Sequence, residues 1–108
     1  MGRYINTYTS TKTQEQLAYI ADDFFAKEGF KTYDYKGETV FKLGSGWLSA
    51  PQFIKLNIVQ NQVHIEAFLK YPVLPGVYVG EMSLKGFWGF AMKKILLNRV
   101  QNLERLLA

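Results

Sequence analysis

The spacing of apolar residues near the start of the chain predicts a strand and then a helix. Residues 3–9 alternate aromatic or aliphatic residues with polar ones, and this alternation is typical of a short strand. Further along, apolar residues recur at the spacing of one helix face, and they are Leu17, Ile20, Ala21 and Phe24. The sequence therefore predicts a strand followed by an amphipathic helix.

Residues that start and stop helices flank this apolar face. In a capping box, a threonine and a glutamine three positions later bind free N–H groups at a helix start. Two pairs have this spacing, and they are Thr11 with Gln14 and Thr13 with Gln16. Gly29 can adopt the left-handed conformation that ends many helices. We expect the helix to begin after one of these threonines and to end at Gly29.

Residues 30–43 predict a β-hairpin around a glycine. A loop of residues 37–39 would place Tyr35 opposite Phe41, so that one face of the hairpin is aromatic and aliphatic. A two-residue loop would instead place Asp34 opposite Phe41 and mix the two faces. We therefore expect the loop of residues 37–39.

A second hairpin is predicted from residues 53–60 and 63–71, which flank residues 61–62. The expected cross-strand pairs on its apolar face are Ile58 with Ile65, Leu56 with Ala67, and Ile54 with Leu69. The other face is mixed, and it carries Phe53, Lys55, Asn57, Val59, His64, Glu66, Phe68 and Lys70. Such alternation is what a sheet covered on only one side requires, so the second face is expected to be open.

The remaining elements follow a proline-rich segment. Two prolines within residues 71–76 disfavour a continuing strand there, and residues 77–84 are a further candidate strand. From about residue 90 to residue 107 the apolar positions keep helical spacing. The expected order is β-α-β-β-β-β-α with about five strands.

This order predicts a single α+β domain over residues 1–108. Both helices are expected on one face of an antiparallel sheet, because two amphipathic helices and a sheet with one apolar face form two layers. The topology resembles the TATA-box-binding-protein-like and helix-grip folds. The resemblance concerns the fold and implies no activity.

Composition and charge exclude several classes of protein. The chain has no cysteine, which excludes disulfides and thiolate zinc sites and fits a reducing, cytoplasmic location. No segment has the roughly 20 apolar residues that a membrane-spanning helix needs. The net charge is +4, and the excess lies after residue 50, where seven basic residues face three acidic ones. This small excess permits an anionic partner without requiring one.

The inventory of reactive side chains argues against an enzyme. His64 is the only histidine, and its neighbours on the same strand face are Gln62 and Glu66. A histidine–glutamate pair can move protons, but no nucleophile is tied to it by a motif. We therefore expect no catalytic residues, no structural metal and no cofactor.

Two glycine-containing clusters stand out, at residues 42–52 and 83–94. The second contains Gly86-Phe-Trp-Gly89, which lacks both the GxGxxG and the GK[ST] patterns of phosphate-binding loops and is too bulky for a phosphate cradle. We expect it to be a structural entry to the last helix, with solvated lysines around it. If its aromatic residues protrude, the two clusters would form a basic aromatic surface of Trp47, Lys85, Phe87, Trp88, Lys93 and Lys94.

The same two clusters carry a resemblance to a known family. The first reads Lys42-Leu-Gly-x-Gly-Trp-x-x-Ala-Pro-Gln52, and the second begins Met82-x-x-Lys-Gly-Phe-x-Gly89. Together they resemble a family of small domains of unknown activity found mainly in Gram-positive bacteria. The resemblance spans residues 42–94 and implies neither a substrate nor a cofactor.

Three function classes follow, in order of preference. The first is a non-catalytic interaction domain that binds a protein partner or a second copy through the open sheet face or the tryptophan clusters. The second is a binder of a small apolar ligand or an anionic lipid surface. The third is a single-strand nucleic-acid binder that uses Lys55 and Lys70 with Phe53 and Phe68. Nucleic acid is not expected, because Glu66 lies within that patch and the charge is low.

Overall fold

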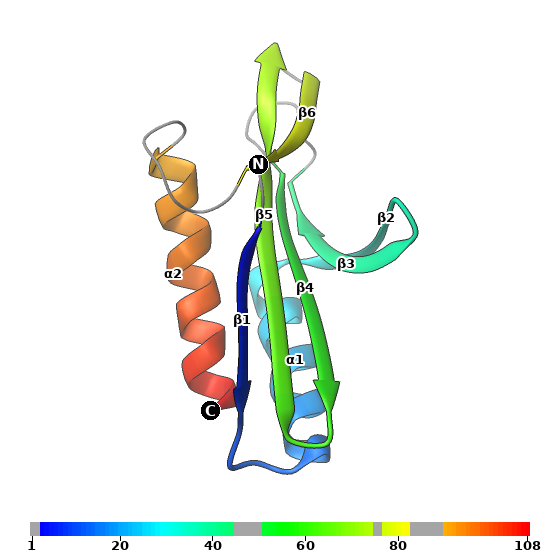
Figure 1. Ribbon diagram of the computed structural model, residues 1–108, viewed down its shortest axis with the longest axis vertical. Helices are drawn as coiled ribbons and strands as arrows, with labels where there is room; N and C mark the ends of the chain where they lie inside the picture. Colours follow the sequence, from blue (N-terminus) through cyan, green and yellow to red (C-terminus); the bar gives the residue numbers. More distant parts are fainter. Residues whose placement is uncertain (1–2, 45–50, 75–76, 83–89) are drawn as a thin grey trace.

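The computed structural model describes residues 3–44, 51–74, 77–82 and 90–108. Its elements form two layers, a sheet and a pair of helices (Figure 1). In chain order they are β1 (Tyr4–Thr9), α1 (Gln14–Glu28), β2 (Lys31–Tyr35), β3 (Glu38–Leu43), β4 (Gln52–Val59), β5 (Gln62–Leu74), β6 (Val77–Met82) and α2 (Phe90–Leu107). The predicted two-layer α+β architecture is confirmed, and α2 has the predicted bounds.

The sheet is antiparallel and has six strands, one more than the expected order contains. The strand order is β1-β5-β4-β3-β2, and β6 pairs with the far end of β5. β5 therefore pairs with three strands, β1, β4 and β6. β1 and β6 follow one another along the same side of β5. Pairing with β1 extends to Ala67 of β5, and pairing with β6 starts at Leu69 of β5, whose other side pairs with β4.

The expected interruption at the prolines is wrong, because β5 continues through Pro72 to Leu74. Pairing with β4 ends at Leu69, so among the described strands only β6 lies beside β5 at Pro72. The pairing with β6 is also irregular there, with register shifts on both sides of Pro72. A proline is tolerated at such an edge or bulge, because no neighbour requires its missing N–H.

The expected loop of the first hairpin is also wrong. Lys36 and Gly37 form a two-residue turn, and Tyr35 pairs with Glu38. Both turn residues have positive φ angles, 52° and 86°. Such angles fit the tight turns whose twist matches that of the strands. Tyr33 consequently lies opposite Val40, and Phe41 pairs with Thr32 rather than with Tyr35 or Asp34. Tyr35 and Phe41 therefore lie on opposite faces of the sheet, so the expected aromatic and aliphatic face of this hairpin is wrong.

The second hairpin has the predicted faces with different partners. It turns at residues 60–61, and the pairs are Ile58 with Val63, Leu56 with Ile65, and Ile54 with Ala67. Each residue of β4 thus pairs with a β5 residue two positions earlier in the chain than expected. A shift of two residues keeps every side chain on its face, because side chains alternate with a period of two. The prediction of the faces is confirmed and that of the partners is wrong.

The ends of α1 follow the signals in the sequence. Thr13 and Gln16 form the capping box, with the Thr13 N–H donating to Gln16 at 3.0 Å and the Gln16 N–H donating to Thr13 at 3.2 Å. Gly29 closes the helix in the left-handed conformation with a φ of 85°. Of the two capping boxes that the sequence allowed, the second is the one formed.

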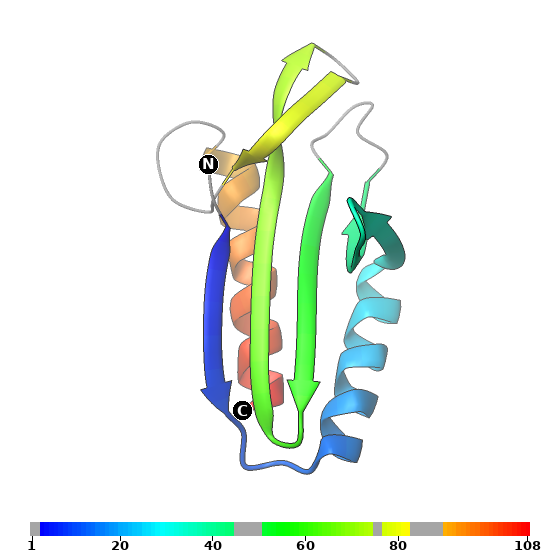
Figure 2. The same ribbon diagram turned by 45° about the vertical axis from the view of Figure 1, so that its right-hand side comes forward.

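Both helices cover one face of the sheet, called here the inner face (Figure 2). The core between the layers consists of Leu17, Ala21, Phe24, Phe25, Phe30, Ile54, Val63, Ile65, Ala67, Leu69, Leu96, Val100, Leu103 and Leu107. Phe25 of α1 stacks on Phe41 of β3 with ring centroids 3.8 Å apart. Leu56 and Ile58 are partly buried and pack against this core. The predicted apolar face of the second hairpin is therefore the one that meets the helices.

Candidate functional site

The outer face of the sheet, on the side away from the helices, is covered at one end. The β2–β3 hairpin curls over it, and Tyr35 and Val40 pack on Phe53 and Phe68. These four residues form an outer aromatic cluster, in which the rings of Phe53 and Phe68 stack with centroids 4.9 Å apart. Phe53 is 1% and Phe68 0% exposed, so the expectation that they lie on an open face is wrong. Sheet twist explains the difference, because it turns a hairpin at the sheet edge across the neighbouring strands.

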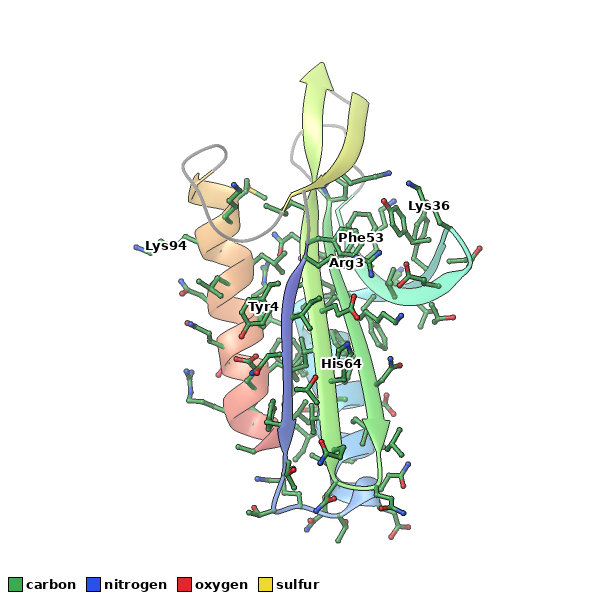
Figure 3. The ribbon with its side chains drawn as sticks, viewed as in Figure 1. Arg3, Tyr4, Lys36, Phe53, His64 and Lys94 are labelled. Atoms are coloured by element: carbon green, nitrogen blue, oxygen red, sulfur yellow. The ribbon has the colours of Figure 1, made fainter. Side chains whose placement is uncertain are left out.

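Arg3 seals this cluster. Its guanidinium lies 4.3 Å from the centroid of the Phe68 ring. It donates two hydrogen bonds to Glu38, at 2.9 and 2.8 Å, and one to Glu66, at 2.9 Å. Figure 3 shows Arg3 near Phe53, with His64 farther along the same face. Arg3, which directly precedes β1, thus connects it to β3 and β5. Paired bonds to a carboxylate are among the stronger hydrogen bonds in proteins.

Further polar contacts extend from the two glutamates. The Lys55 ammonium donates to Glu38 at 3.0 Å. The His64 ring lies between Glu66, 2.7 Å from its Nε2, and the Thr7 hydroxyl, 2.6 Å from its Nδ1. Of the predicted surface residues, Lys55, His64 and Glu66 therefore come together. We call Arg3, Thr7, Glu38, Lys55, His64 and Glu66 the outer network.

The network lowers the pKa values of its carboxyl groups. Hydrogen bonds from Arg3, and then from Lys55, hold the pKa of Glu38 at about 2. Burial alone would raise the pKa of Glu66, but the hydrogen bonds from His64 and Arg3 outweigh it and lower that pKa. Both glutamates are consequently ionised at neutral pH.

The order of Thr7, His64 and Glu66 is that of a nucleophile, a base and an orienting acid. Such a triad also needs donors aimed at the oxyanion that forms during acyl transfer. Backbone N–H groups of a sheet lie in its plane, so the described part of this face directs none toward a group bound above Thr7. The contacts of Thr7 and Glu66 fix the position of His64, but no described backbone N–H group supplies the oxyanion contact that such a triad also needs.

The other predicted surface residues have four different outcomes. The Lys70 ammonium lies 5.1 Å from the centroid of the Tyr35 ring, at the border of the outer aromatic cluster. Lys94 is exposed, as expected. Lys93 is only 7% exposed, so the expectation that it is solvated is wrong. It shares a helix face with buried Leu96 and Val100, three and seven positions later. Trp47, Lys85, Phe87 and Trp88 lie outside the described residues.

The β1 edge of the sheet, at the other end of the strand order from β2, has a feature that was not predicted from the sequence. Figure 2 shows β1 at the rim of the molecule, and no described strand pairs with its outer side. The Ser10 N–H donates to the Asn61 carbonyl at 2.7 Å, in line with the β1–β5 register. Because ladder bonds alternate, the backbone groups of Ile5, Thr7 and Thr9 point to the free side. Ile5 is also 60% exposed.

Helix α2 is held against β1 by hydrogen bonds to Glu104. The Tyr4 hydroxyl and the Asn6 amide donate to its carboxylate at 2.6 and 2.9 Å, and the Tyr8 hydroxyl donates to its carbonyl at 3.0 Å. Burial, and after it the nearby Glu104 carboxylate, raises the pKa of both tyrosines to about 12. A hollow of about 370 Å³ lies here between β1 and α2, lined by Asn6, Tyr8, Gln101, Glu104, Arg105 and Ala108.

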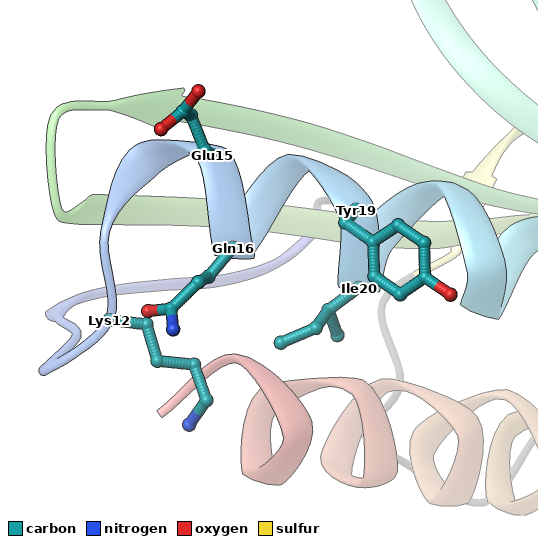
Figure 4. Close-up of a pocket in the computed structure, with 5 residues that line it drawn as sticks. All are labelled: Lys12, Glu15, Gln16, Tyr19 and Ile20. Atoms are coloured by element: carbon teal, nitrogen blue, oxygen red, sulfur yellow. The ribbon is translucent and has the colours of Figure 1, made fainter.

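Two more hollows lie elsewhere on the surface. The larger, of about 530 Å³, is lined by Lys12, Glu15, Gln16, Tyr19 and Ile20. Figure 4 shows Lys12 and Ile20 directed toward α2 and Glu15 directed away from it. The other, of about 380 Å³, adjoins the β2–β3 hairpin. Neither is lined by Thr7, His64 or Glu66, so neither places a cavity beside the histidine.

Among the described residues, no group of three or more histidine, aspartate or glutamate side chains is placed to hold a metal ion. The described helices include none that is long and apolar enough to cross a membrane. The chain matches no family model, no curated protein and no solved structure. The family resemblance of residues 42–94 therefore stays a prediction.

Proposed function

We propose that the chain is a non-catalytic protein-interaction domain that binds an extended segment of a partner as an extra strand on the free edge of β1. The proposal rests on one observation, which is that the outer side of β1 has no strand paired with it among the described residues. On its other side β1 pairs with β5 over its whole length. An unpaired edge presents a row of N–H and C=O groups that another chain can join.

Two edge strands of the described sheet, β1 and β2, differ in how well they are protected against pairing with another chain. β2 has five residues, carries Lys31 and Asp34, and curls over the outer face. Short, charged and twisted edges of this kind resist pairing with other chains. β1 contains neither charge nor proline in its sequence Tyr-Ile-Asn-Thr-Tyr-Thr. The contrast supports β1 as the edge that accepts a strand.

A strand added to β1 would have a different environment on each face of the sheet. Main-chain hydrogen bonds would form with the outward backbone groups of Ile5, Thr7 and Thr9, and they supply affinity in strand addition. Alternate side chains of the added strand would lie beside exposed Ile5 on the outer face and beside the hollow next to α2 on the inner face.

The other function classes have less support. Core side chains fill the interior between sheet and helices, and the hollow between β1 and α2 is lined mainly by polar and charged residues, which does not suit an apolar ligand. Phe53 and Phe68 are buried, so their ring faces are covered and cannot stack on bases. A cytoplasmic location is part of the proposal, because a chain without cysteine suits a reducing compartment.

The proposal can be tested with peptides selected from a random library displayed on phage. Ile5→Pro removes an outward N–H without breaking a bond to β5, and Ile5→Val is the matched control that keeps it. Selected peptides should bind the wild type and Ile5→Val, and should bind Ile5→Pro at least about tenfold more weakly, as loss of strand hydrogen bonds implies.

Hydrogen exchange locates the binding site in the same experiment. The amides of Ile5, Thr7 and Thr9 should exchange quickly in the free domain and slowly in the complex. Protection of these amides in the peptide-free protein, together with a dimer in gel filtration, would identify a second copy as the occupant. Peptides that bind without protecting them, or that bind Ile5→Pro as well as wild type, would contradict strand addition at β1.

A further inference from the structure

Two lysines face each other at the edge of the sheet farthest from β1. Lys31 of β2 and Lys42 of β3 are direct partners in the antiparallel pairing, so their side chains share a face. Both line the hollow of about 380 Å³ beside the hairpin, together with Gly29, Thr32, Tyr33 and Gly44. Like charges directly opposite one another destabilise a sheet, so this pair needs an explanation.

No carboxylate compensates the two charges within the part of the chain that the structure describes. Neither Lys31 nor Lys42 forms an ion pair there. Glu28 accepts a hydrogen bond from Arg99, and Glu38 is held by the outer network. Asp34 lies on the opposite face of β2, because it is an odd number of positions from Lys31. The nearest acidic side chains along the sequence are therefore engaged or turned away.

The end of α1 does not supply the missing negative charge either. It lies at Gly29, where carbonyl groups of the last turn would attract cations. Two of these carbonyls already accept bonds, Ala26 from the Gly29 N–H at 3.3 Å and Phe25 from the Phe30 N–H at 2.9 Å. The helix end thus offers the lysines only a weak partial charge.

Aromatic rings position one of the ammonium groups. The Lys42 Nζ lies 4.3 Å from the centroid of the Tyr33 ring and 6.0 Å from that of Phe53. A ring face attracts a cation but does not neutralise it. Tyr33 itself is 42% exposed, so part of its ring remains available to a ligand.

We propose that this hollow binds a phosphate group between Lys31 and Lys42. A phosphate monoester carries close to two negative charges at neutral pH, which matches two ammonium groups better than a single carboxylate does. In a hairpin closed by the Tyr35–Glu38 pair, the Thr32 N–H points to the free side of β2 and adds a neutral donor. The exposed part of Tyr33 would contact an organic group attached to the phosphate. This site is independent of strand addition at β1.

Titration with two named probes distinguishes free phosphate from a phosphate ester. Inorganic phosphate and phenyl phosphate are added to the whole chain, with chloride at equal ionic strength as the reference, because salt alone screens the repulsion between the lysines. We expect saturable shifts of the Thr32 and Tyr33 amide resonances and a higher melting temperature with either phosphate probe. Tighter binding of phenyl phosphate would identify an ester as the ligand, and equal binding would identify the free anion.

Variants at the pair complete the test. Lys31→Gln and Lys42→Gln should each weaken phosphate binding about tenfold or more, as loss of a charged hydrogen bond implies. Lys94→Gln, at an exposed lysine on α2, should bind like the wild type. In chloride at low ionic strength, Lys31→Gln should melt at the same temperature as the wild type or higher, because repulsion is removed. Equal effects of chloride and phosphate, or unchanged binding by Lys31→Gln, would overturn the proposal.

Discussion

Replacing Arg3 with alanine tests whether the outer network stabilises the fold. The change removes the paired bonds to Glu38, the bond to Glu66 and the contact with the Phe68 ring. It also leaves two partly buried carboxylates with fewer partners, which is the costly way to break such a network. We therefore expect a clear loss of stability although Arg3 lies close to the chain terminus.

The magnitude follows from the pKa of Glu38. Its pKa is lowered from 4.5 to about 2, which corresponds to at most about 3 kcal/mol. Solvent reaches 30% of this side chain and Lys55 contributes part of the effect, so about 1–2 kcal/mol belongs to Arg3 after allowance for screening. The cation–ring contact adds about 0.5–1 kcal/mol. Arg3→Ala should thus lower the free energy of unfolding by about 2 kcal/mol and the melting temperature by about 8–12 °C.

The pH dependence of this loss separates the network from simple packing. The pKa values of Glu38 and Glu66 are lowered in the folded state, so their stabilisation is present above the unfolded pKa near 4.5. It is lost as the pH falls through the folded pKa, which is about 2 for Glu38. The difference between wild type and Arg3→Ala in urea denaturation should therefore shrink between pH 5 and pH 2.

Arg3→Lys is the matched control, because it keeps the charge but not the paired geometry. It should fall between the wild type and Arg3→Ala in stability. An Arg3→Ala variant within about 0.5 kcal/mol of the wild type at pH 7, the range of ordinary surface substitutions, would refute the reasoning. A difference that stays constant down to pH 2 would show that packing on the Phe68 ring, and not charge, is responsible.

Three further predictions concern single side chains. Phe53→Ala should lower the free energy of unfolding by about 3 kcal/mol, because it opens a cavity in the outer aromatic cluster. The control Val59→Ala, on the same face of β4 but exposed, should change it by less than about 0.5 kcal/mol. Equal melting temperatures of the two variants would contradict the burial of Phe53. Thr13→Ala should cost about 1 kcal/mol in urea denaturation through loss of the helix cap, and an unchanged midpoint would argue against the capping box. Neither the wild type nor His64→Ala should hydrolyse p-nitrophenyl acetate with saturable kinetics, and a turnover abolished in His64→Ala would show that the domain is an enzyme.

The elements, and the faces of α1, β4 and β5, could be predicted from local patterns, whereas partners along the sheet and the faces of the first hairpin could not. The residues that cap α1 are local signals, because Thr13 and Gln16 are three positions apart and Gly29 directly follows the helix. Such signals can be recognised in the sequence alone. The register of β4 and β5 is different, because a shift of two positions preserves the apolar face that the pattern records. The turn conformation decides the register, and Lys36 in the first hairpin gave no such signal, because positive φ is uncommon for lysine.

The outer aromatic cluster and the free edge depend on contacts between distant parts of the chain. Arg3 reaches Glu38 and Glu66, which are 35 and 63 positions away. Nothing in the spacing of Phe53 and Phe68 indicates that a neighbouring hairpin covers them. The exposure of β1 likewise follows from the strand order, which is set by pairing across the whole chain. Sequence patterns could therefore propose Lys55, His64 and Glu66 as surface neighbours without identifying Arg3 as the residue that joins them.

The contacts between β1 and α2 have a consequence for synthesis on the ribosome. Tyr4 and Asn6 bind Glu104, and Ser10 and Thr11 bind the Ala108 carbonyl. A nascent chain that has emerged only as far as β6 can form the hairpins, but it leaves half of the inner sheet face without its helix. During this interval the apolar inner face beside β1 is exposed to other nascent chains, next to an edge that stays unpaired in the finished fold. Covering of this inner face thus depends on α2, and slow translation of residues 90–108 should increase aggregation more than slow translation of residues 14–28.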